Sequence, residues 1–516
     1  MKKLIIKPWF LAGLIAVLLS GCEKQLDITP KQAINADNAL TSREAIDASI
    51  TGIYARLKSA RLYGRDLIAI PEALADNGFA TNKSGRLLPE AQNNQGAHFT
   101  TTIWTSGYAG INQINLTLEA IPNLDAGLNI TLVEKDRWEG QLYFLRALLY
   151  FEMMKVYAYF PGAVVTAQNK GGVPIILKGV ALPSQAQLVL PARAPIDDVF
   201  TQIVSDFSKA NDQLLNTGSG LAAATASKSA AQGMLARVNL YRNNMGEAKR
   251  WADSCIALAS GRLSTTGTYI NQWRAPDHGE ALFQVRFATA AENIGVNESL
   301  QTSYTTLVTS GITTVTGGFG DLVPTLTMLA DLGITGPTTA NFGSNATITA
   351  RSTDIRNLLF EVGTTGRGPA KVECTKYFGR SGAINLDNVP LIRIAEIYLI
   401  RAEAQATLGS PVFNMAAALA DLKTIKTRRY TDYTGSLQEI ADNIATQSNL
   451  YTEILRQRRI ELAFEGQRFF DLKRLGRDLI KAPHYNTVAF TDTRILAPIL
   501  QADVDGNPNL QQNAGY

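Results

Sequence analysis

The sequence predicts a mostly α-helical protein built on degenerate helical repeats, with one long irregular region. Apolar residues recur at the helical period of about 3.6 in several long segments. Alanine-rich helix pairs are expected near residues 228–258 and 391–426. Between about residues 260 and 388, Thr, Gly, Ser and Asn dominate. Helical pairs separated by insertions fit a repeat scaffold better than an α/β fold, in which strands and helices alternate.

The first 22 residues have the pattern of a bacterial lipoprotein signal. A lysine-containing start is followed by an apolar run over residues 10–19 and then by Ser20-Gly21-Cys22. The run is shorter than a helix that spans a bilayer. We expect a signal peptide over residues 1–21 and acylation of Cys22, since each buried methylene adds about 0.8 kcal/mol to membrane anchoring. The alternative is an ordinary secretory signal with an incidental cysteine.

Charge argues against a nucleic-acid partner. The formal net charge is +4, and three lysines lie in the signal, which leaves about +1 for residues 22–516. A chain without a basic surplus has little to neutralise phosphates. No stretch after the signal is long and apolar enough to cross a membrane. We therefore expect a folded body on a lipid tether.

Histidines and cysteines are few. His98, His278 and His484 lack the spacing of a metal site or of a catalytic triad, so we expect no metal and no cofactor. Cys255 and Cys374 remain after the signal. They either pair in an oxidising compartment or lie buried as small hydrophobic residues.

The first helix is expected to start near residue 41. Thr41 and Glu44 have the spacing of a capping box, in which two side chains satisfy free backbone N–H groups. The apolar stripe of this helix consists of Leu40, Ile46, Ile50, Ile53, Tyr54 and Leu57.

The second helix is long and should be mostly buried. It stops before Pro161-Gly162, because proline cannot continue the backbone hydrogen bonds. Residues 171–177 are then expected to form an extended segment. The stripe of the helix consists of Trp138, Leu142, Leu145, Leu149, Met153 and Val156, widened by Tyr143, Phe144, Tyr150, Phe151 and Tyr157.

The remaining helices come in pairs. A third helix is expected over residues 199–214, followed by a linker over 218–229 and a pair over 228–241 and 246–258. A second pair is expected over 391–409 and 416–426. Small residues stand where a tetratricopeptide repeat needs close helix packing, at Ala236, Ala248, Ala252 and Cys255.

A charged segment follows over residues 454–474. Arg458, Glu461, Glu465 and Arg468 are three to four residues apart, so they could form a ladder of ion pairs along one helix. Gly466 should end or bend that helix.

Two carboxylates of this segment, Glu461 and Glu465, could be read as an acid/base pair. Flanking arginines lower carboxylate pKa values and make poor general acids. We therefore predict structural ion pairs in which Arg459, Glu461, Glu465 and Arg468 contact one another or buried backbone groups.

Several segments, in the same order along the chain, resemble the SusD/RagB family of outer-membrane lipoproteins. They are Cys22 with Leu26-Asp27 and Pro30, Trp104–Pro122, Phe144–Ala147, Gly172–Ile175, Gly320 with Pro324-Thr325, Ile394–Ala404 and Ile454–Arg474. The resemblance covers essentially the whole chain after the signal.

The resemblance implies a fold and a role. The fold is four tetratricopeptide-like repeats with an irregular, loop-rich, ligand-facing lobe. The chain then divides into an N-terminal SusD-like region over residues 22–220 and a C-terminal RagB/SusD region over 221–516 that share one helical-repeat core. The role is that of a non-catalytic surface lipoprotein of the outer membrane. It binds a nutrient, expected to be an oligosaccharide, and forms a lid on a SusC-like TonB-dependent barrel.

Candidate ligand contacts follow from the chemistry of sugars. A pyranose presents an apolar face to an aromatic ring and hydroxyls to amide, carboxylate and guanidinium groups. Each aromatic could instead belong to the core, as we expect for Trp138 and Trp251. The candidates are Trp104, Tyr108, Asn112, Asp76, Asn77, Trp273 and Tyr304.

Three other functions remain open at this stage. A member of the same family could bind peptides or another nutrient. A secreted glycoside hydrolase would need two carboxylates facing each other across a cleft, and nothing in the sequence selects such a pair. A repeat scaffold that only assembles partner proteins would need no small ligand. The irregular region either binds the ligand or consists of surface loops without a binding role, and the sequence is compatible with both.

Overall fold

The computed structural model describes residues 39–96, 98–99, 103–181, 190–216, 223–379 and 383–516. Cys22 and the signal lie outside these ranges. The longer helices in chain order are α2 (Arg43–Leu57), α5 (Ile103–Ala120), α6 (Leu132–Tyr157), α8 (Ile196–Gln213), α9 (Lys228–Tyr241), α10 (Met245–Ala259), α14 (Ile394–Ala406), α15 (Met415–Lys426) and α17 (Gln447–Glu461).

Shorter elements connect these helices. The short helices are α3 (Asp66–Leu74), α4 (Leu88–Ala91), α11 (Tyr269–Gln272), α12 (Leu300–Tyr304), α13 (Leu326–Asp331), α16 (Leu437–Asn443), α18 (Arg468–Arg474) and α19 (Gln501–Gly506). The strands are β1 (Gly78–Ala80), β2 (Ala281–Val285), β3 (Leu322–Pro324), β4 (Ile334–Thr335), β5 (Ala350–Arg351), β6 (Phe360–Val362), β7 (Val372–Cys374) and β8 (Val389–Arg393). They form the antiparallel pairs β1–β3, β2–β8, β4–β5 and β6–β7.

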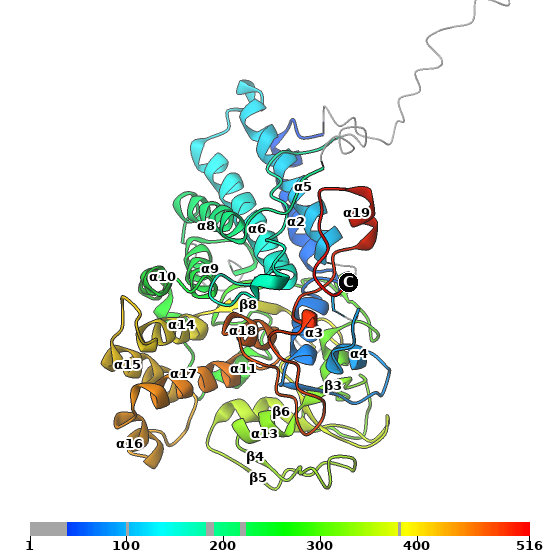
Figure 1. Ribbon diagram of the computed structural model, residues 1–516, viewed down its shortest axis with the longest axis vertical. Coiled ribbons are helices and arrows are strands. Elements are labelled where there is room, and N and C mark those ends of the chain that lie inside the picture. The colour runs from blue at the N-terminus through cyan, green and yellow to red at the C-terminus, as the bar shows by residue number, and fades with distance from the viewer. Residues whose placement is uncertain (1–38, 97, 100–102, 182–189, 217–222, 380–382) are drawn as a thin grey trace, which may run out of the picture.

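The long helices pack in succession. α6 contacts α5 and α8, α9 contacts α8 and α10, and α14 contacts α10, α15 and α17. Figure 1 shows these helices on one side of the molecule and the short strands β4, β5 and β6 with α13 at the lower end. The predicted mostly α-helical repeat scaffold is confirmed, and the irregular region contains short strands and single helical turns as expected.

Local sequence sets the helix ends. The side chains of Thr131 and Glu134 form a capping box at the start of α6. At α2 the cap is Ser42, whose hydroxyl accepts from the backbone N–H of Ala45, so the predicted capping box at Thr41 is wrong. Within the segment expected as a helix from residue 391, Leu391–Arg393 belongs to β8, because these residues pair with β2.

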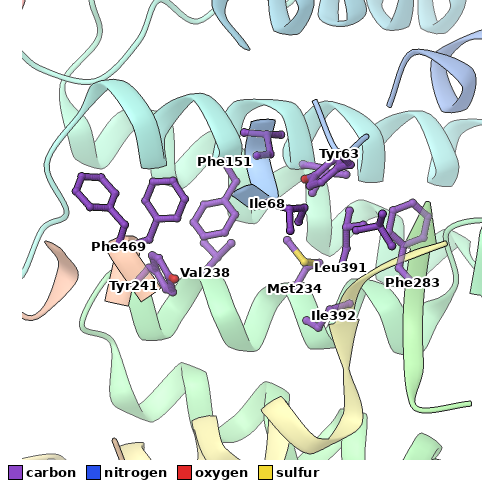
Figure 2. Packing of buried hydrophobic residues seen from close by; sticks show 14 of the residues in the cluster. Tyr63, Ile68, Phe151, Met234, Val238, Tyr241, Phe283, Leu391, Ile392 and Phe469 are labelled. Atoms are coloured by element: carbon purple, nitrogen blue, oxygen red, sulfur yellow. The ribbon is translucent and has the colours of Figure 1, made fainter. Parts of the chain in front are cut away.

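One hydrophobic cluster joins the N-terminal and C-terminal parts of the described chain. Its members run from Ile46 to Leu510 and include the fully buried Trp138. Cys255 and Cys374 are free and buried, as small hydrophobic residues are. Figure 2 shows side chains of α3 and the turn before it, of α6, α9 and α18, and of the β2–β8 pair meeting in this core: Tyr63, Ile68, Phe151, Met234, Val238, Tyr241, Phe283, Leu391, Ile392 and Phe469.

Glycines allow α5 and α6 to approach closely. A Cβ at Gly107 would lie 2.8 Å from the sulfur of Met153, and one at Gly110 would lie 2.7 Å from a methyl carbon of Leu149. Both distances are shorter than real Cβ contacts, so a larger residue would push the helices apart. In the described ranges, no helix combines the length and apolar character that crossing a membrane requires.

A buried ionic cluster connects the helical scaffold to the irregular region. Glu461, at the end of α17, accepts hydrogen bonds from Arg429 at 2.9 Å, from Arg393 at 2.9 Å and from Arg356 at 3.2 Å. Arg393 and Arg429 also contact Glu280, at 2.8 and 2.7 Å. The side chains of these five residues are at most 1% exposed.

A second buried cluster lies among the C-terminal helices. Arg458 of α17 contacts Glu396 of α14 at 3.1 Å and Asp471 of α18 at 2.8 Å. Arg237 of α9 contacts the same Glu396. Arg474 joins Asp471 to Glu403. Four helices are therefore linked by charge pairs inside the protein.

The predicted ladder within residues 458–468 is wrong. α17 ends at Glu461, five residues before Gly466, and the chain turns through Phe464 and Gly466, whose φ angles are 63° and 76°. Glu465 and Arg468 therefore leave the helix face that the spacing assumed.

The predicted structural residues do form ion pairs, but with other segments. Glu465 contacts Arg393 at 2.8 Å and Lys376 at 2.6 Å. Arg459 and Arg468 both contact Asp76, at 3.4 and 2.6 Å. The partners lie far away in sequence, which spacing alone could not indicate.

We expect Glu461→Gln to lower the free energy of unfolding by about 3–5 kcal/mol, the usual cost of breaking a buried ion pair. The amide would leave buried guanidinium groups without a counter-charge. Urea denaturation of the parent and variant measures the change. Glu247→Gln is the matched control, because Glu247 pairs with Arg250 on the surface, where such a pair contributes about 0–1 kcal/mol. Equal small effects at both positions would contradict the prediction.

We also expect acid to destabilise the protein below the unfolded glutamate pKa of about 4.3. Burial alone would raise the pKa of Glu461, but Arg429, Arg393 and Arg356 outweigh burial and hold this pKa well below its usual value. The unfolded state then binds the proton more readily, so this stability is present above that pH and is lost as pH falls. Melting temperatures between pH 7 and pH 3 measure the effect. A profile as steep in Glu461→Gln as in the parent would assign it to other groups.

Candidate ligand-binding site

A cleft of about 490 Å³ lies beside the N-terminal end of α5. Such a volume is within the usual range of small-molecule sites. Its walls come from α5, from Pro174, Ile176 and Pro191, and from the C-terminal segment around α19, which lies near α5 in Figure 1. The lining residues are Trp104, Thr105, Tyr108, Pro174, Ile176, Pro191, Leu500, Ala502, Asp503, Gly506, Asn507 and Leu510.

The second wall is fixed to α5 by side-chain hydrogen bonds. The hydroxyl of Tyr108 donates to the carbonyl of Pro174 at 2.8 Å. The side-chain amide of Asn112 donates to the carbonyl of Val180 at 3.0 Å and accepts from its N–H at 2.7 Å. Because the described residues 174–181 form no strand, these bonds replace the ladder that a sheet would provide.

The third wall is held by Arg193 and Asn513. Arg193 donates to the carbonyls of Gly172 and Tyr157, at 2.7 and 2.9 Å, and to the side-chain oxygen of Asn513 at 2.8 Å. Asn513, which is 1% exposed, also donates to the carbonyl of Ala497 at 2.6 Å. Burial lowers the pKa of Arg193 to about 10, so the side chain stays charged at neutral pH. The C-terminal segment is therefore anchored beside the cleft.

The lining combines apolar and polar groups. Rings and aliphatic groups come from Trp104, Tyr108 and Leu510, and polar groups come from Thr105, Asp503 and Asn507. Asp503 is exposed. Burial raises the pKa of Tyr108 well above its usual value, and the nearby charge of Asp503 adds to this. Tyr108 therefore stays neutral, and an apolar surface next to one carboxylate suits a ring with hydroxyls.

Two aromatic candidates from the sequence, Trp104 and Tyr108, line this cleft. Trp104 is 4% exposed and meets Tyr108 and Tyr157 edge to face, with centroid distances of 5.0 and 5.1 Å. Only a small part of the indole can touch a ligand. Tyr108 is half-buried and presents more of its ring. The amide of Asn112 is occupied by Val180, so it supports the wall rather than the cleft surface.

Asp76 and Asn77 are not among the lining residues of this cleft. The carboxylate of Asp76 contacts Arg468 at 2.6 Å and Arg459 at 3.4 Å. Asn77 accepts from Arg459 at 2.8 Å and donates to Glu72 at 2.8 Å. Both residues hold the segment after α3 against the C-terminal part of the chain.

Trp273 and Tyr304 are buried, at 8% and 0% exposure, so the expectation of a free stacking ring at these positions is wrong. Trp273 lies beneath Lys376 and Arg393, with the cations 4.8 and 5.5 Å from the ring centroid. Tyr304 packs edge to face against Phe464 at 5.0 Å. These rings cover the buried ionic cluster and the turn after α17.

Asp503, Asn507 and Pro191 line the cleft but are not among the ligand contacts expected from the sequence. Asn507 donates its amide to the carbonyl of Pro191 at 2.9 Å, which joins two cleft walls across more than 300 residues. The turn-forming pair Asn507-Pro508 was a signal for a chain reversal here. Nothing local indicated that this reversal lies beside Trp104.

Two family models match the chain. The model described as "SusD family" matches residues 343–516, and the model described as "Starch-binding associating with outer membrane" matches residues 24–240. A protein named "SusD-like protein P38" from Formosa agariphila is 24% identical over 97% of this chain and 96% of its own length.

Solved structures share the fold. A SusD superfamily protein from Bacteroides thetaiotaomicron is 24% identical, with a TM-score of 0.74, over 91% of this chain and 99% of its own. A structure titled "Laminarin binding SusD-like protein" is 18% identical, with a TM-score of 0.67, over 92% of this chain and 100% of its own. At these identities the likeness establishes the fold.

We expect Trp104→Ala to lower the free energy of unfolding by about 3–5 kcal/mol, the usual cost of removing a buried large aromatic ring. The ring is almost fully enclosed, so its loss leaves a cavity between α5 and α6. Thermal or urea denaturation measures the change. Trp251→Ala is the control, because Trp251 is only partly buried on α10. A loss at Trp104 no larger than at Trp251 would show that the Trp104 ring contributes little to packing.

Proposed function

This chain belongs to the SusD/RagB family, and from that premise we propose that it is a non-catalytic lipoprotein that captures a glycan at the outer membrane. The cleft beside Trp104 and Tyr108 carries the proposal. Its lining combines apolar ring surface with a hydroxyl and a carboxylate, which is a combination that suits a sugar ring with hydroxyls. The laminarin-binding relative has the same fold and supports a glycan as the ligand.

The lining of the cleft favours binding over hydrolysis. Glycoside hydrolysis commonly uses two carboxylates about 5–10 Å apart. Among the described lining residues, Asp503 is the carboxylate that faces the cleft. Capture needs only enough affinity to hold a nutrient until a transporter accepts it. Peptide or another nutrient is the alternative ligand within the same family.

The proposal includes a membrane tether and a partner. Acylation of Cys22 would anchor the chain through residues that precede the described part. A SusC-like TonB-dependent barrel would receive the ligand, as the resemblance implies. The family description "associating with outer membrane" supports this location.

We expect Asp503→Asn to weaken glycan binding about tenfold, because a hydrogen bond to a charged group contributes more than one to a neutral amide. Asp503 is exposed, so the substitution should leave stability unchanged. Calorimetric titration with the glycan that the parent protein binds best on an array measures the change. Asp505→Asn is the matched control on the same helix, since Asp505 is exposed but is not a lining residue.

Three outcomes would count against this proposal. Parental affinity in Asp503→Asn, together with a loss in Asp505→Asn, would show that the ligand binds outside the cleft. Failure of the parent to bind any glycan would make a peptide or another nutrient the leading ligand. Hydrolysis of a bound glycan by the purified protein would overturn the non-catalytic assignment.

A further inference from the structure

A half-buried ring in the irregular region carries two arginine side chains. Phe319 follows Gly317-Gly318 just before β3. The guanidinium carbons of Arg86 and Arg367 lie 4.8 and 3.9 Å from its ring centroid. At these distances the negative face of the ring attracts the cations, so the ring helps to hold each guanidinium group in place.

The two arginines differ in how much of their donor capacity is already used. Arg86 donates to the hydroxyl of Ser84 at 3.0 Å and to Asn297 at 3.1 Å, and it lies 3.5 Å from a carboxylate oxygen of Asp321. Arg367 is exposed and donates through Nε to the carbonyl of Gly318 at 2.9 Å. Among the ion pairs of the described residues, none involves Arg367. Its two terminal nitrogens therefore remain available to a ligand.

The lysines and carboxylates near this ring are largely buried, and they are engaged with other groups of the protein. Lys371 donates to the carbonyl of Ser344 at 3.1 Å, and burial together with the charge of Lys83 lowers its pKa. Lys83 itself lies 3.4 Å from the buried Glu373. The carboxylates of Glu373 and Asp321 are 0% and 1% exposed, so a ligand in solvent can reach Arg367 without meeting either of them.

Space for a ligand is present next to Arg367. Thr365, Gly366 and Gly368 are exposed, and a Cβ at Gly368 would meet no atom within 4 Å. The loop is held on its inner side, because the hydroxyls of Thr364 and Thr316 share a hydrogen bond of 2.6 Å. An open surface on a fixed loop lets a guanidinium act without first ordering its backbone.

We propose that Arg367, held over Phe319, binds the carboxylate or sulfate group of an acidic oligosaccharide. This rests on the proposed glycan-binding function and names the class of glycan. Guanidinium is planar and donates two parallel N–H bonds, which match the spacing of two oxygens on a carboxylate or sulfate. Neutral sugars lack such a group and gain nothing from the free charge on Arg367. A site of this kind selects ligands by charge and loses affinity as salt rises.

The test pairs each acidic glycan with its neutral form. Tetragalacturonate and its methyl ester report on carboxylates, and a sulfated carrageenan tetrasaccharide and its desulfated form report on sulfates. Titration of the full chain with all four probes, at low and at high salt, measures the preference. We expect at least one acidic probe to bind ten times more tightly than its neutral form, with a preference that falls as salt rises.

Arg367→Gln should reduce that preference about tenfold. Arg250→Gln is the matched control, because Arg250 also lies over a ring at 4.0 Å, that of Trp251 on α10, and its side chain is 53% exposed. Melting temperatures of both variants check that the fold is intact. A preference that persists in Arg367→Gln, or falls equally in Arg250→Gln, would overturn the proposed site.

The results separate this inference from the function on which it rests. Neutral probes bound as tightly as the acidic ones would overturn the acidic-ligand site and leave glycan capture standing. Binding of no probe, and of no glycan on an array, would overturn both.

Discussion

The pairing of Glu461 with three arginines is the constraint on which the rest of the structure depends. A buried carboxylate is strongly disfavoured unless nearby cations and hydrogen bonds replace water. Here the cations come from before β6, from the end of β8 and from the segment after α15, up to 105 residues away along the chain. The helix end and the irregular region can therefore reach their final positions only together.

The buried ionic clusters leave ligand binding to residues on the surface. Inside the protein, carboxylates and cations are matched and held at most a few percent exposed, so they have no capacity left for a ligand. The side chains with capacity to spare, Asp503 and Arg367, lie outside these clusters and on the surface. A rigid scaffold with a few free polar groups fits the proposed capture of a glycan, because little of the backbone has to be ordered on binding.

Local sequence predicted the long helices well. The apolar stripes of α2 and α6 and the small residues of α9 and α10 matched the structure, because helical periodicity and caps are properties of neighbouring residues. Local signals failed where a distant partner decided the outcome. Leu391–Arg393 has the composition of the helix that follows, but pairing with β2 places it in a strand. Ser42 caps α2 in place of Thr41. This shift of one residue lies within the usual variation of helix boundaries.

Sequence alone thus determined the helical class, the helix pairs and the presence of a charged C-terminal segment. Only the tertiary structure decided which residues of the candidate site meet. It placed Trp104 beside Asp503, turned Trp273 onto the buried Arg393 and gave Glu465 partners from β8 and from the segment after β7. These outcomes depend on contacts between residues that are 72 or more positions apart. Their energies come from burial and charge pairing, which no local pattern of residues encodes.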